Sequence, residues 1–373
     1  MKLVVAIFMA IFIYVFQKSL YGKFWDRGLD VKVDFYDSYI NQGDRSYITE
    51  VINNAKFLPL SILHVKFAAP LSFTFEDKEN AALSDSYYRN DVFSVMPNKK
   101  ITRRLYFDAK KRGYFVIDGA NVISKDFFLT KNFAKNIPHK SDIYVFPEKY
   151  ENKIIDSVFS MVIGDIENDR SLIEDPFTFR GIREYDDTCS MKRINWKATA
   201  KTDKLMVNLY NHTSLQNIRV LLNLDTNNMI KAEYLDEVSI SLASTVCNYF
   251  LNKNLNVAVT SNGLDVVTKN TGTVELGSSI KHMMSIDKYL SRLEGQDGVE
   301  GFMDIIDAEI NARRNNTTYV IISPYYKEDL LKKLDVLQRR GTGVFMLVPY
   351  YNIHGYNKMR SYMHGWEVNI YET

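Results

Sequence analysis

The first third of the chain, after an apolar start, alternates hydrophobic and polar residues. Between residues 31 and 36 the sequence VKVDFY places an apolar side chain at every second position, the period of a strand with one buried face. Similar segments recur and are separated by turn-forming runs such as NQGD at residues 41–44. Short strands at this spacing predict an immunoglobulin-like β-sandwich over residues 28–120. The expected strands lie at residues 31–36, 47–51, 61–67, 71–75, 101–107 and 113–117.

From residue 217 onward, apolar blocks alternate with segments of helical periodicity. A helix is predicted over residues 234–251, where apolar side chains recur three or four positions apart. Strands that are apolar throughout and separated by helices predict a parallel sheet covered on both faces, so residues 216–373 are expected to form a Rossmann-type α/β domain. Further helices are expected at residues 280–293, 302–312 and 327–339, and strands at 218–224, 256–260, 319–323 and 344–348.

Residues 121–215 follow neither pattern consistently. The run DIYVF at residues 142–146 predicts a strand that Pro147 ends. An acidic, polar stretch over residues 164–175 is expected to be an exposed face, and it precedes a dense basic and aromatic segment at residues 179–204. The fold class expected for the whole chain is therefore mixed, with β structure first and α/β structure last.

The N-terminal segment predicts a membrane helix over residues 1–25. The unbroken apolar run from Leu3 to Phe16 spans about 21 Å as a helix, shorter than the roughly 30 Å hydrocarbon core. Apolar residues between Leu20 and Trp25 extend the run, and Lys18 can reach the membrane interface.

The alternative interpretation of this segment is a secretory signal peptide that is cleaved. Such a peptide needs small residues at its cleavage site, and residues 16–25 offer no A-x-A type site. An uncleaved single-pass anchor is therefore favoured. Lys18, Lys23 and Arg27 follow the apolar run, so the positive-inside rule predicts that the bulk of the chain lies in the cytoplasm.

Size and composition predict a chain of two or three domains without a recognisable catalytic motif. The chain has 373 residues, 46% of them hydrophobic, and a net charge of +2, which excludes a globally basic nucleic-acid binder. Its two cysteines, Cys189 and Cys247, cannot form a disulfide framework. Zinc-ligand spacing, a phosphate-binding loop and a nucleophile elbow are all missing from the sequence. We therefore expect no enzyme, no cofactor and no small-molecule substrate.

The segment at residues 179–204 is the strongest local signal, because cations surround Tyr185 and Trp196. One interpretation is structural, with Arg183, Tyr185 and Trp196 packed against the α/β domain and the lysines solvated. A second is a surface for an acidic protein partner, since Arg, Tyr and Trp dominate interface energetics. A third, a phosphate, nucleic-acid or anionic-lipid site, is opposed by interspersed acids. The cations are Arg180, Arg183, Lys192, Arg193, Lys197, Lys201 and Lys204, and the acids are Glu184, Asp186, Asp187 and Asp203.

Part of this segment matches a known signature. The matching residues are Gly181, Arg183, Tyr185, Ile194, Trp196, Ala200 and Lys201, with upstream similarities at Arg112-Gly113-Tyr114, Asp126-Phe127-Phe128 and residues 144–147. The chain thereby resembles the bacterial domain-of-unknown-function family 58, from about residue 28 to residue 350. It departs from the family at Thr188-Cys189, which stand where the family has Gly-Asp, and at Lys192, which replaces an arginine. It also shows one membrane helix where the family commonly has two.

The resemblance implies that the α/β domain is similar to a von Willebrand factor A domain, which holds a divalent metal through a D-x-S-x-S motif. The equivalent residues begin at Asp225, which matches, and Asn227 offers a carbonyl oxygen. Met229 is no ligand for a hard cation, and the strand ending at Ser323 supplies no aspartate. We therefore expect no metal. The competing hypothesis is a degenerate Mg²⁺ site at Asp225 and Asn227 that a partner carboxylate completes. Another alternative is that Asp225 caps a loop or a helix.

The resemblance also implies a partner, a MoxR-type AAA+ ATPase. We expect a membrane-anchored, non-enzymatic binding or scaffold protein, with the rim around Asp225 as a recognition face. A cysteine enzyme that pairs Cys189 with His212 has no support from spacing. The residues expected to form the signature or partner-binding surface are Arg180, Gly181, Arg183, Tyr185, Lys192, Arg193, Trp196 and Lys201.

Overall fold

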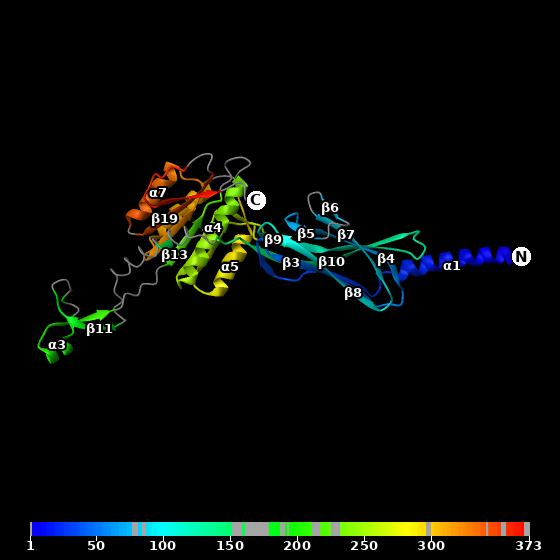
Figure 1. Cartoon of the computed structure of the whole chain (residues 1–373), viewed down its shortest axis with the longest axis horizontal. Coiled ribbons are helices and arrows are strands. Elements are labelled where there is room, and N and C mark those ends of the chain that lie inside the picture. The colour runs from blue at the N-terminus through cyan, green and yellow to red at the C-terminus, as the bar shows by residue number, and fades with distance from the viewer. Residues whose placement is uncertain are drawn as a thin grey trace. The chain divides into compact units, whose positions relative to one another are not determined.

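The computed structural model divides the chain into two compact units (Figure 1). The first unit comprises Met1–Glu148 with Leu290–Arg292, and the second comprises Lys149–Tyr289 with Leu293–Thr373. The structure describes residues 2–76, 81–83, 87–150, 159–160, 179–186, 191, 194–210, 217–224, 232–295, 300–340, 342–351 and 356–368.

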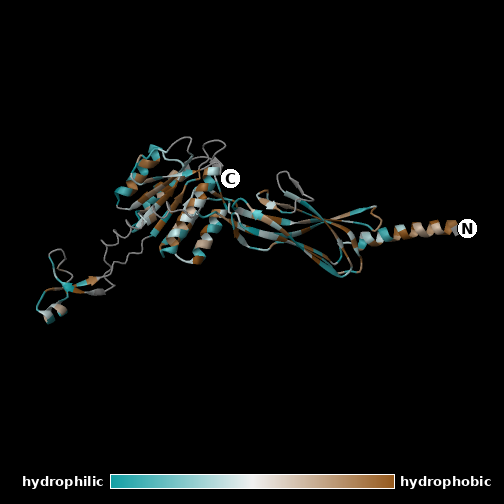
Figure 2. Ribbon diagram, viewed as in Figure 1, coloured by the Kyte–Doolittle hydropathy of each residue, from teal (hydrophilic) through white to brown (hydrophobic). Residues whose placement is uncertain are grey.

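The chain begins with a long apolar helix, α1 (Lys2–Phe24). Its span from Leu3 to Phe24 is long and apolar enough to cross a membrane, and Figure 2 shows the apolar colouring along most of it. Its last turn differs from the expectation that residues up to Trp25 extend the membrane segment. Tyr21 and Trp25 are only 3% and 6% exposed, because both pack into the core of the first unit. The helix therefore runs directly into the folded unit without a linker.

The first unit is a β-sandwich. Buried residues alternate along its strands and those of both sheets meet in one core, as the alternation in the sequence predicts. The strands pair antiparallel, apart from β2 with β10. The four-stranded sheet has the order β1 (Leu29–Phe35), β3 (Arg45–Asn54), β8 (Lys99–Ala109), β5 (Phe73–Phe75). The six-stranded sheet has the order β2 (Tyr39–Asn41), β10 (Asn132–Phe146), β9 (Gly113–Lys125), β4 (Leu60–Ala69), β7 (Tyr87–Val95), β6 (Ala81–Leu83).

The sandwich extends beyond the boundary expected near residue 120. Strand β9 runs through that position, and β10 pairs with it from Asn132 opposite Lys125 to Val145 opposite Gly113. The run at residues 142–146 thus completes the larger sheet and does not belong to a separate region. A bulge between Ile137 and Lys140 interrupts the pairing opposite Gly119, whose φ is +87°.

The α/β part of the second unit has a sheet that is parallel except for β16, which is antiparallel to β14. Helices cover both faces (Figure 1), α6 and α7 on one side and α4 and α5 on the other. The sheet has the order β16 (Gly272–Gly277), β14 (Asn256–Ser261), β13 (Asn217–Leu222), β18 (Thr317–Ile322), β19 (Gly343–Tyr351), β20 (Met363–Val368). The helices are α4 (Ala232–Asn252), α5 (Ile280–Ser291), α6 (Glu300–Ala312) and α7 (Glu328–Arg339), and a ribbon pairs β15 (Leu264–Asp265) with β17 (Leu293–Glu294).

The basic and aromatic segment forms a small hairpin of its own. Strand β11 (Phe179–Glu184) pairs antiparallel with β12 (Met206–Tyr210), and the short helix α3 (Trp196–Thr202) lies between them in sequence. A register shift between Phe179 and Gly181 bends β11. The described signature residues therefore lie on one local motif whose elements are consecutive in the chain.

Candidate functional site

Local hydrogen bonds tie helix α3 to strand β12. Asn195 caps the helix, because its side-chain oxygen accepts a hydrogen bond from the backbone N–H of Ala198 at 2.9 Å. Its amide also donates to the side chain of Asn208 on β12 at 2.7 Å. The Thr199 hydroxyl accepts from the backbone N–H of Met206 at 3.0 Å. These bonds position the first residue of the helix, Trp196, without burying it.

Apolar side chains on this hairpin face solvent. Trp196 is 69% exposed and Met191 is 72% exposed, and Ile182 and Leu205 are also exposed. Helix α3 has no buried residue, and Val207 is the one fully buried apolar side chain among the described residues of the motif. A two-stranded hairpin with so little core is only marginally stable alone, so these side chains form a surface suited to docking.

The hairpin carries two ion pairs and, on α3, two lysines that form none with the described residues. Arg183 contacts Asp186 at 2.7 Å, and Lys204 pairs with Glu184, so the acids in the sequence neutralise cations locally. The pairing with Glu184 raises the pKa of Lys204. Lys197 and Lys201 extend from α3 with no ion pair to any described residue. The surface around Trp196 is thus apolar with two cations beside it.

The structure places the predicted signature residues unevenly. Gly181, Arg183, Tyr185, Trp196 and Lys201 are brought together on the hairpin, where the backbone N–H of Tyr185 donates to the carbonyl of Leu205 at 2.7 Å. The exposure of Trp196 differs from the structural interpretation, in which this indole packs inward. The backbone of Arg180 lies in β11, whereas its side chain, together with Lys192, Arg193, Thr188 and Cys189, lies outside the described residues.

A second candidate lies at the carboxyl edge of the parallel sheet, where β13, β14 and β18 end. Asn223 donates to the Ser323 hydroxyl at 2.9 Å, and Asn262 donates to the side-chain oxygen of Asn223 at 2.9 Å. The side-chain oxygen of Asn262 in turn accepts a hydrogen bond from the backbone N–H of Leu224 at 2.8 Å. All three polar side chains are buried, so their donors and acceptors are used within the fold.

This network bears on the metal hypothesis. The Ser323 hydroxyl accepts from Asn223 and donates to the carbonyl of Tyr325 at 2.8 Å, so it holds the end of β18 and does not face a ligand. Asp225 and Asn227 lie outside the described residues. Among the residues that are described, no cluster of three or more His, Cys, Asp or Glu side chains could hold a metal ion. The sequence signal for this network is the polar residue that follows each apolar strand.

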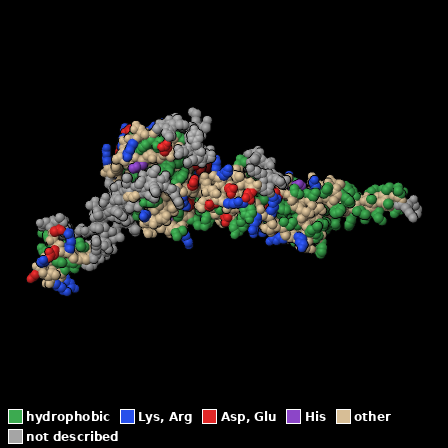
Figure 3. All heavy atoms as spheres, in the orientation of Figure 1, with side chains coloured by type: hydrophobic (Ala, Val, Ile, Leu, Met, Phe, Trp, Pro, Cys, Tyr) green, Lys and Arg blue, Asp and Glu red, His purple; other side chains and the backbone are tan. Residues whose placement is uncertain are grey.

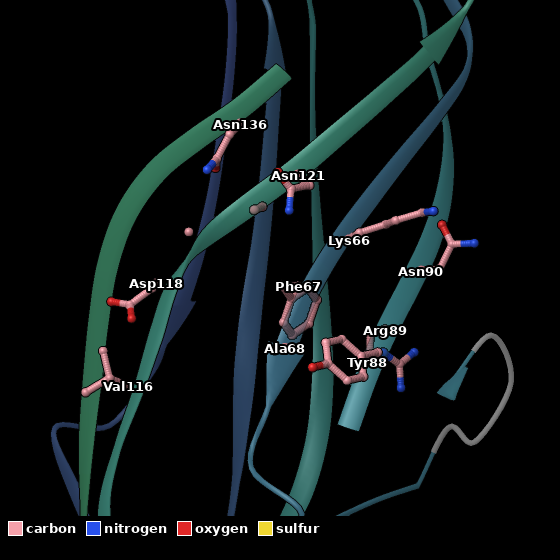
Figure 4. Close-up of a pocket in the computed structure, with 12 residues that line it drawn as sticks. Lys66, Phe67, Ala68, Tyr88, Arg89, Asn90, Val116, Asp118, Asn121 and Asn136 are labelled. Atoms are coloured by element: carbon pink, nitrogen blue, oxygen red, sulfur yellow. The ribbon is translucent and has the colours of Figure 1, made fainter. Parts of the chain in front are cut away.

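A third feature is a groove of about 790 Å³ on the outer face of the six-stranded sheet (Figure 4). Strands β4, β7, β9 and β10 line it with the amides of Asn90, Asn121 and Asn136 and the charges of Lys66 and Asp118. This lining suits a polar ligand that hydrogen-bonds, and it offers no paired groups for acid–base chemistry. The sequence does not predict this groove, because polar residues at the outward positions of an alternating strand are expected in any half-buried sheet.

A strongly perturbed titratable group lies inside the sandwich. Arg89 donates two hydrogen bonds to Asp91, each at 3.0 Å, and Arg103 donates a third at 2.9 Å. Glu50 is fully buried beside them, and neither of its carboxyl oxygens has a hydrogen-bond partner among the described residues. Burial, followed by the charge of Asp91, raises the pKa of Glu50 to about 8. Of these four residues, Arg103 reaches the surface, which indicates a structural cluster and not a reactive cleft.

Comparisons with known proteins leave the function open. No family model and no curated protein matches the chain. Among solved structures, a cohesin module from a Clostridium perfringens family 33 glycoside hydrolase is 6% identical, with 31% of this chain and 96% of that chain covered and a TM-score of 0.25.

Two other solved structures match equally distantly. The sixth cohesin of Acetivibrio cellulolyticus scaffoldin B, in complex with a Cel5 dockerin, is 9% identical, with 32% and 99% covered and a TM-score of 0.23. The major pilin SpaD from Corynebacterium diphtheriae is 10% identical, with 34% and 39% covered and a TM-score of 0.23. Because these TM-scores are far below 0.5, the function has to be argued from this chain's own residues.

Proposed function

We propose that the protein is a membrane-anchored, non-enzymatic binding protein that holds a protein partner through the β11–β12 hairpin. One observation carries the proposal: Trp196 is 69% exposed on a motif that has almost no core. Exposed tryptophan beside free cations is the composition of an interface hot spot for an acidic partner. Lys197 and Lys201 supply the cations.

Retention of α1 as the anchor is supported by its packing. Cleavage after Tyr21, between residues 21 and 25, would remove Tyr21, whose hydroxyl donates to the carbonyl of Pro59 at 3.0 Å from within the sandwich. Removing a buried aromatic residue costs about 3–5 kcal/mol, so the folded unit depends on the last turn of the helix. The cations after the apolar run favour a cytoplasmic location for the rest of the chain.

We further propose that the α/β domain is similar to a von Willebrand factor A domain without a working metal site. In chain order its strands run 3-2-1-4-5-6 across the sheet, and the order reverses between β13 and β18, where open α/β sheets bind ligands. The internal bonding of Ser323 supports recognition without metal at this edge. The resemblance to the domain-of-unknown-function family 58 makes a MoxR-type AAA+ ATPase the first partner to test.

The test is a binding measurement between the full chain in lipid nanodiscs and a purified MoxR-type ATPase from the same source. Trp196→Ala should weaken binding about 30-fold, the loss of about 2 kcal/mol typical of a hot spot. Tyr36→Ala removes another exposed aromatic side chain, located in the sandwich, and should leave the affinity unchanged. Equal affinity of Trp196→Ala and wild type would exclude the hairpin as the contact. No binding by the wild type would exclude this ATPase as the partner.

A further inference from the structure

The turn between β9 and β10 exposes three consecutive apolar side chains. Phe127, Phe128 and Leu129 are 64%, 47% and 51% exposed. Leu129 has a φ of +60°, the left-handed conformation that leucine rarely adopts. A water-facing turn is normally built from polar residues and glycine, so this composition indicates a different environment.

A single carboxylate holds the turn in this shape. Asp126 is fully buried and accepts hydrogen bonds from the backbone N–H of Thr130 at 2.5 Å, from its hydroxyl at 2.7 Å and from the backbone N–H of Lys131 at 3.0 Å. Asp126 thus binds two backbone N–H groups and one hydroxyl of the turn, while the side chains of Phe127, Phe128 and Leu129 remain exposed.

The turn is attached to the middle of α1. The Gln17 amide donates to Asp126 at 3.1 Å, and the Tyr14 hydroxyl donates to Thr130 at 3.3 Å. The rings of Tyr14 and Phe128 lie 6.0 Å apart between centroids. These contacts place the tip of the turn level with residues 14–17 of the helix, about 6–10 Å along the helix from Tyr21, where the helix enters the sandwich core.

This level lies within the thickness of a bilayer. Leu3 to Leu20, the exposed apolar part of the helix, is about 27 Å long at 1.5 Å per residue and barely covers a hydrocarbon core of about 30 Å. Because the helix enters the sandwich core at Tyr21, the membrane boundary must come close to Leu20. Tyr14 lies about 9 Å deeper along the helix. A tip level with Tyr14 is consequently inside the apolar layer whenever α1 spans it.

Two neighbouring loops also expose apolar side chains. Phe57, in the loop between β3 and β4, is 88% exposed, and Met96, in the turn after β7, is 62% exposed. The first loop contacts Tyr21 through the carbonyl of Pro59, and the second is bonded to it because the backbone N–H of Asn98 donates to the carbonyl of Lys56 at 3.1 Å. Apolar side chains thus surround the end of α1, and Figure 3 shows the hydrophobic surface of that helix.

We propose that the helix-proximal end of the sandwich is a bilayer-embedded surface, with Phe127, Phe128 and Leu129 inserted as a wedge beside α1. The occupant of this surface is the acyl-chain layer of the membrane, and the inference rests on the proposed membrane anchoring. Insertion fixes the orientation of the sandwich on the membrane, because two separate points of the unit, α1 and the turn, are then embedded.

The test is a depth measurement on the full chain in nanodiscs of phosphatidylcholine with a minor fraction of phosphatidylglycerol. In a Cys189→Ser, Cys247→Ala background, an environment-sensitive fluorophore is attached to Phe128→Cys. Quenching by lipids spin-labelled in mid-chain is compared with quenching by aqueous iodide. Phe12→Cys on α1 is the embedded reference, and Tyr36→Cys, which replaces another exposed aromatic residue of the sandwich, is the aqueous reference.

We expect lipid quenching at residue 128 of at least about half that at residue 12, and strong iodide quenching at residue 36 alone. If residue 128 behaves like residue 36 while residue 12 is quenched by lipid, the wedge is refuted and the anchor stands. If residue 12 itself is quenched by iodide and not by lipid, the anchor is refuted and the wedge with it. The labelled positions are exposed, so the substitutions should not unfold the protein.

Discussion

Replacing Glu50 by glutamine should remove a large part of the pH dependence of the sandwich. Glu50 lies on β3 between the core residues Ile48 and Ile52, with no exposed surface. Burial and the neighbouring Asp91 carboxylate raise its pKa from 4.5 to about 8. Glu50→Gln keeps the size of the side chain and removes the titrating proton.

The magnitude follows from proton linkage. Because the pKa is higher in the folded than in the unfolded chain, the folded state binds the proton more tightly, and its stability falls as pH rises from 4.5 towards 8. Each pKa unit corresponds to about 1.4 kcal/mol, so the wild type should lose about 4–5 kcal/mol across this window. The glutamine variant lacks this loss, so its free energy of unfolding relative to that of the wild type should rise by the same amount across this window.

The assay is urea unfolding of the full chain in detergent micelles, followed by tryptophan fluorescence at several pH values between 4.5 and 9. Trp25 is buried in the sandwich core and reports on this unit once Trp196 and Trp366 are replaced by phenylalanine. Glu76→Gln is the matched control, because Glu76 is an exposed carboxylate of the same sandwich that pairs with Arg45. It should retain the wild-type pH profile.

The result that would refute this reasoning is a Glu50→Gln profile parallel to that of the wild type between pH 5 and 9. Such a profile would mean that Glu50 is ionised in the folded protein throughout. Its charge would then have to be compensated by Arg89 and Arg103 in spite of its burial.

Further substitutions and one chemical probe test other parts of the fold. Gly119→Ala should destabilise the sandwich by about 3 kcal/mol or more, since a Cβ there would lie 2.4 Å from the carbonyl oxygen of Ile137; Gly43→Ala, at the same φ of +87° with nothing within 4 Å, should cost about 1–2 kcal/mol in the same fluorescence assay. Asn262→Ala should cost about 1–3 kcal/mol and speed hydrogen exchange at the amide of Leu224, which loses its acceptor; unchanged exchange would contradict the network. Burial raises the pKa of the Cys247 thiol, so in a Cys189→Ser background iodoacetamide at pH 8 should modify it at least about 100-fold faster in urea than in the native protein; similar rates would show that the thiol is accessible.

The sequence predicts secondary structure most closely where one hydrophobic pattern continues over a whole element. The helix expected at residues 234–251 is α4, and the strand expected at residues 319–323 matches β18 to within two residues. Strands β16 and β20 escaped prediction because they lie at or near the sheet edges and their residues are largely exposed or polar. Edge strands form through backbone pairing with a neighbour, which leaves little periodicity in the side chains.

For the candidate sites too, the sequence shows which residues are present, whereas the tertiary structure sets their surroundings. The cations and aromatics around Trp196 are visible in the sequence, but whether Trp196 faces a core or solvent is set by the neighbours that fold against it. The bonds between Asn223, Asn262 and Ser323 join residues far apart in the chain, and only the parallel pairing of β13 with β14 and β18 brings them together. No local pattern encodes such a contact.

The sequence by itself determined an apolar N-terminal helix, a β unit before an α/β unit, and a basic aromatic segment between the strand-rich regions, because hydrophobic periodicity is a local property of the chain. Tertiary structure decided where the sandwich ends, that Tyr21 and Trp25 belong to its core, and that Glu50 is buried. It also decided that the turn at Phe127–Leu129 lies beside the middle of α1. These features depend on which distant segments meet, and that is settled by packing and by backbone pairing across the whole unit.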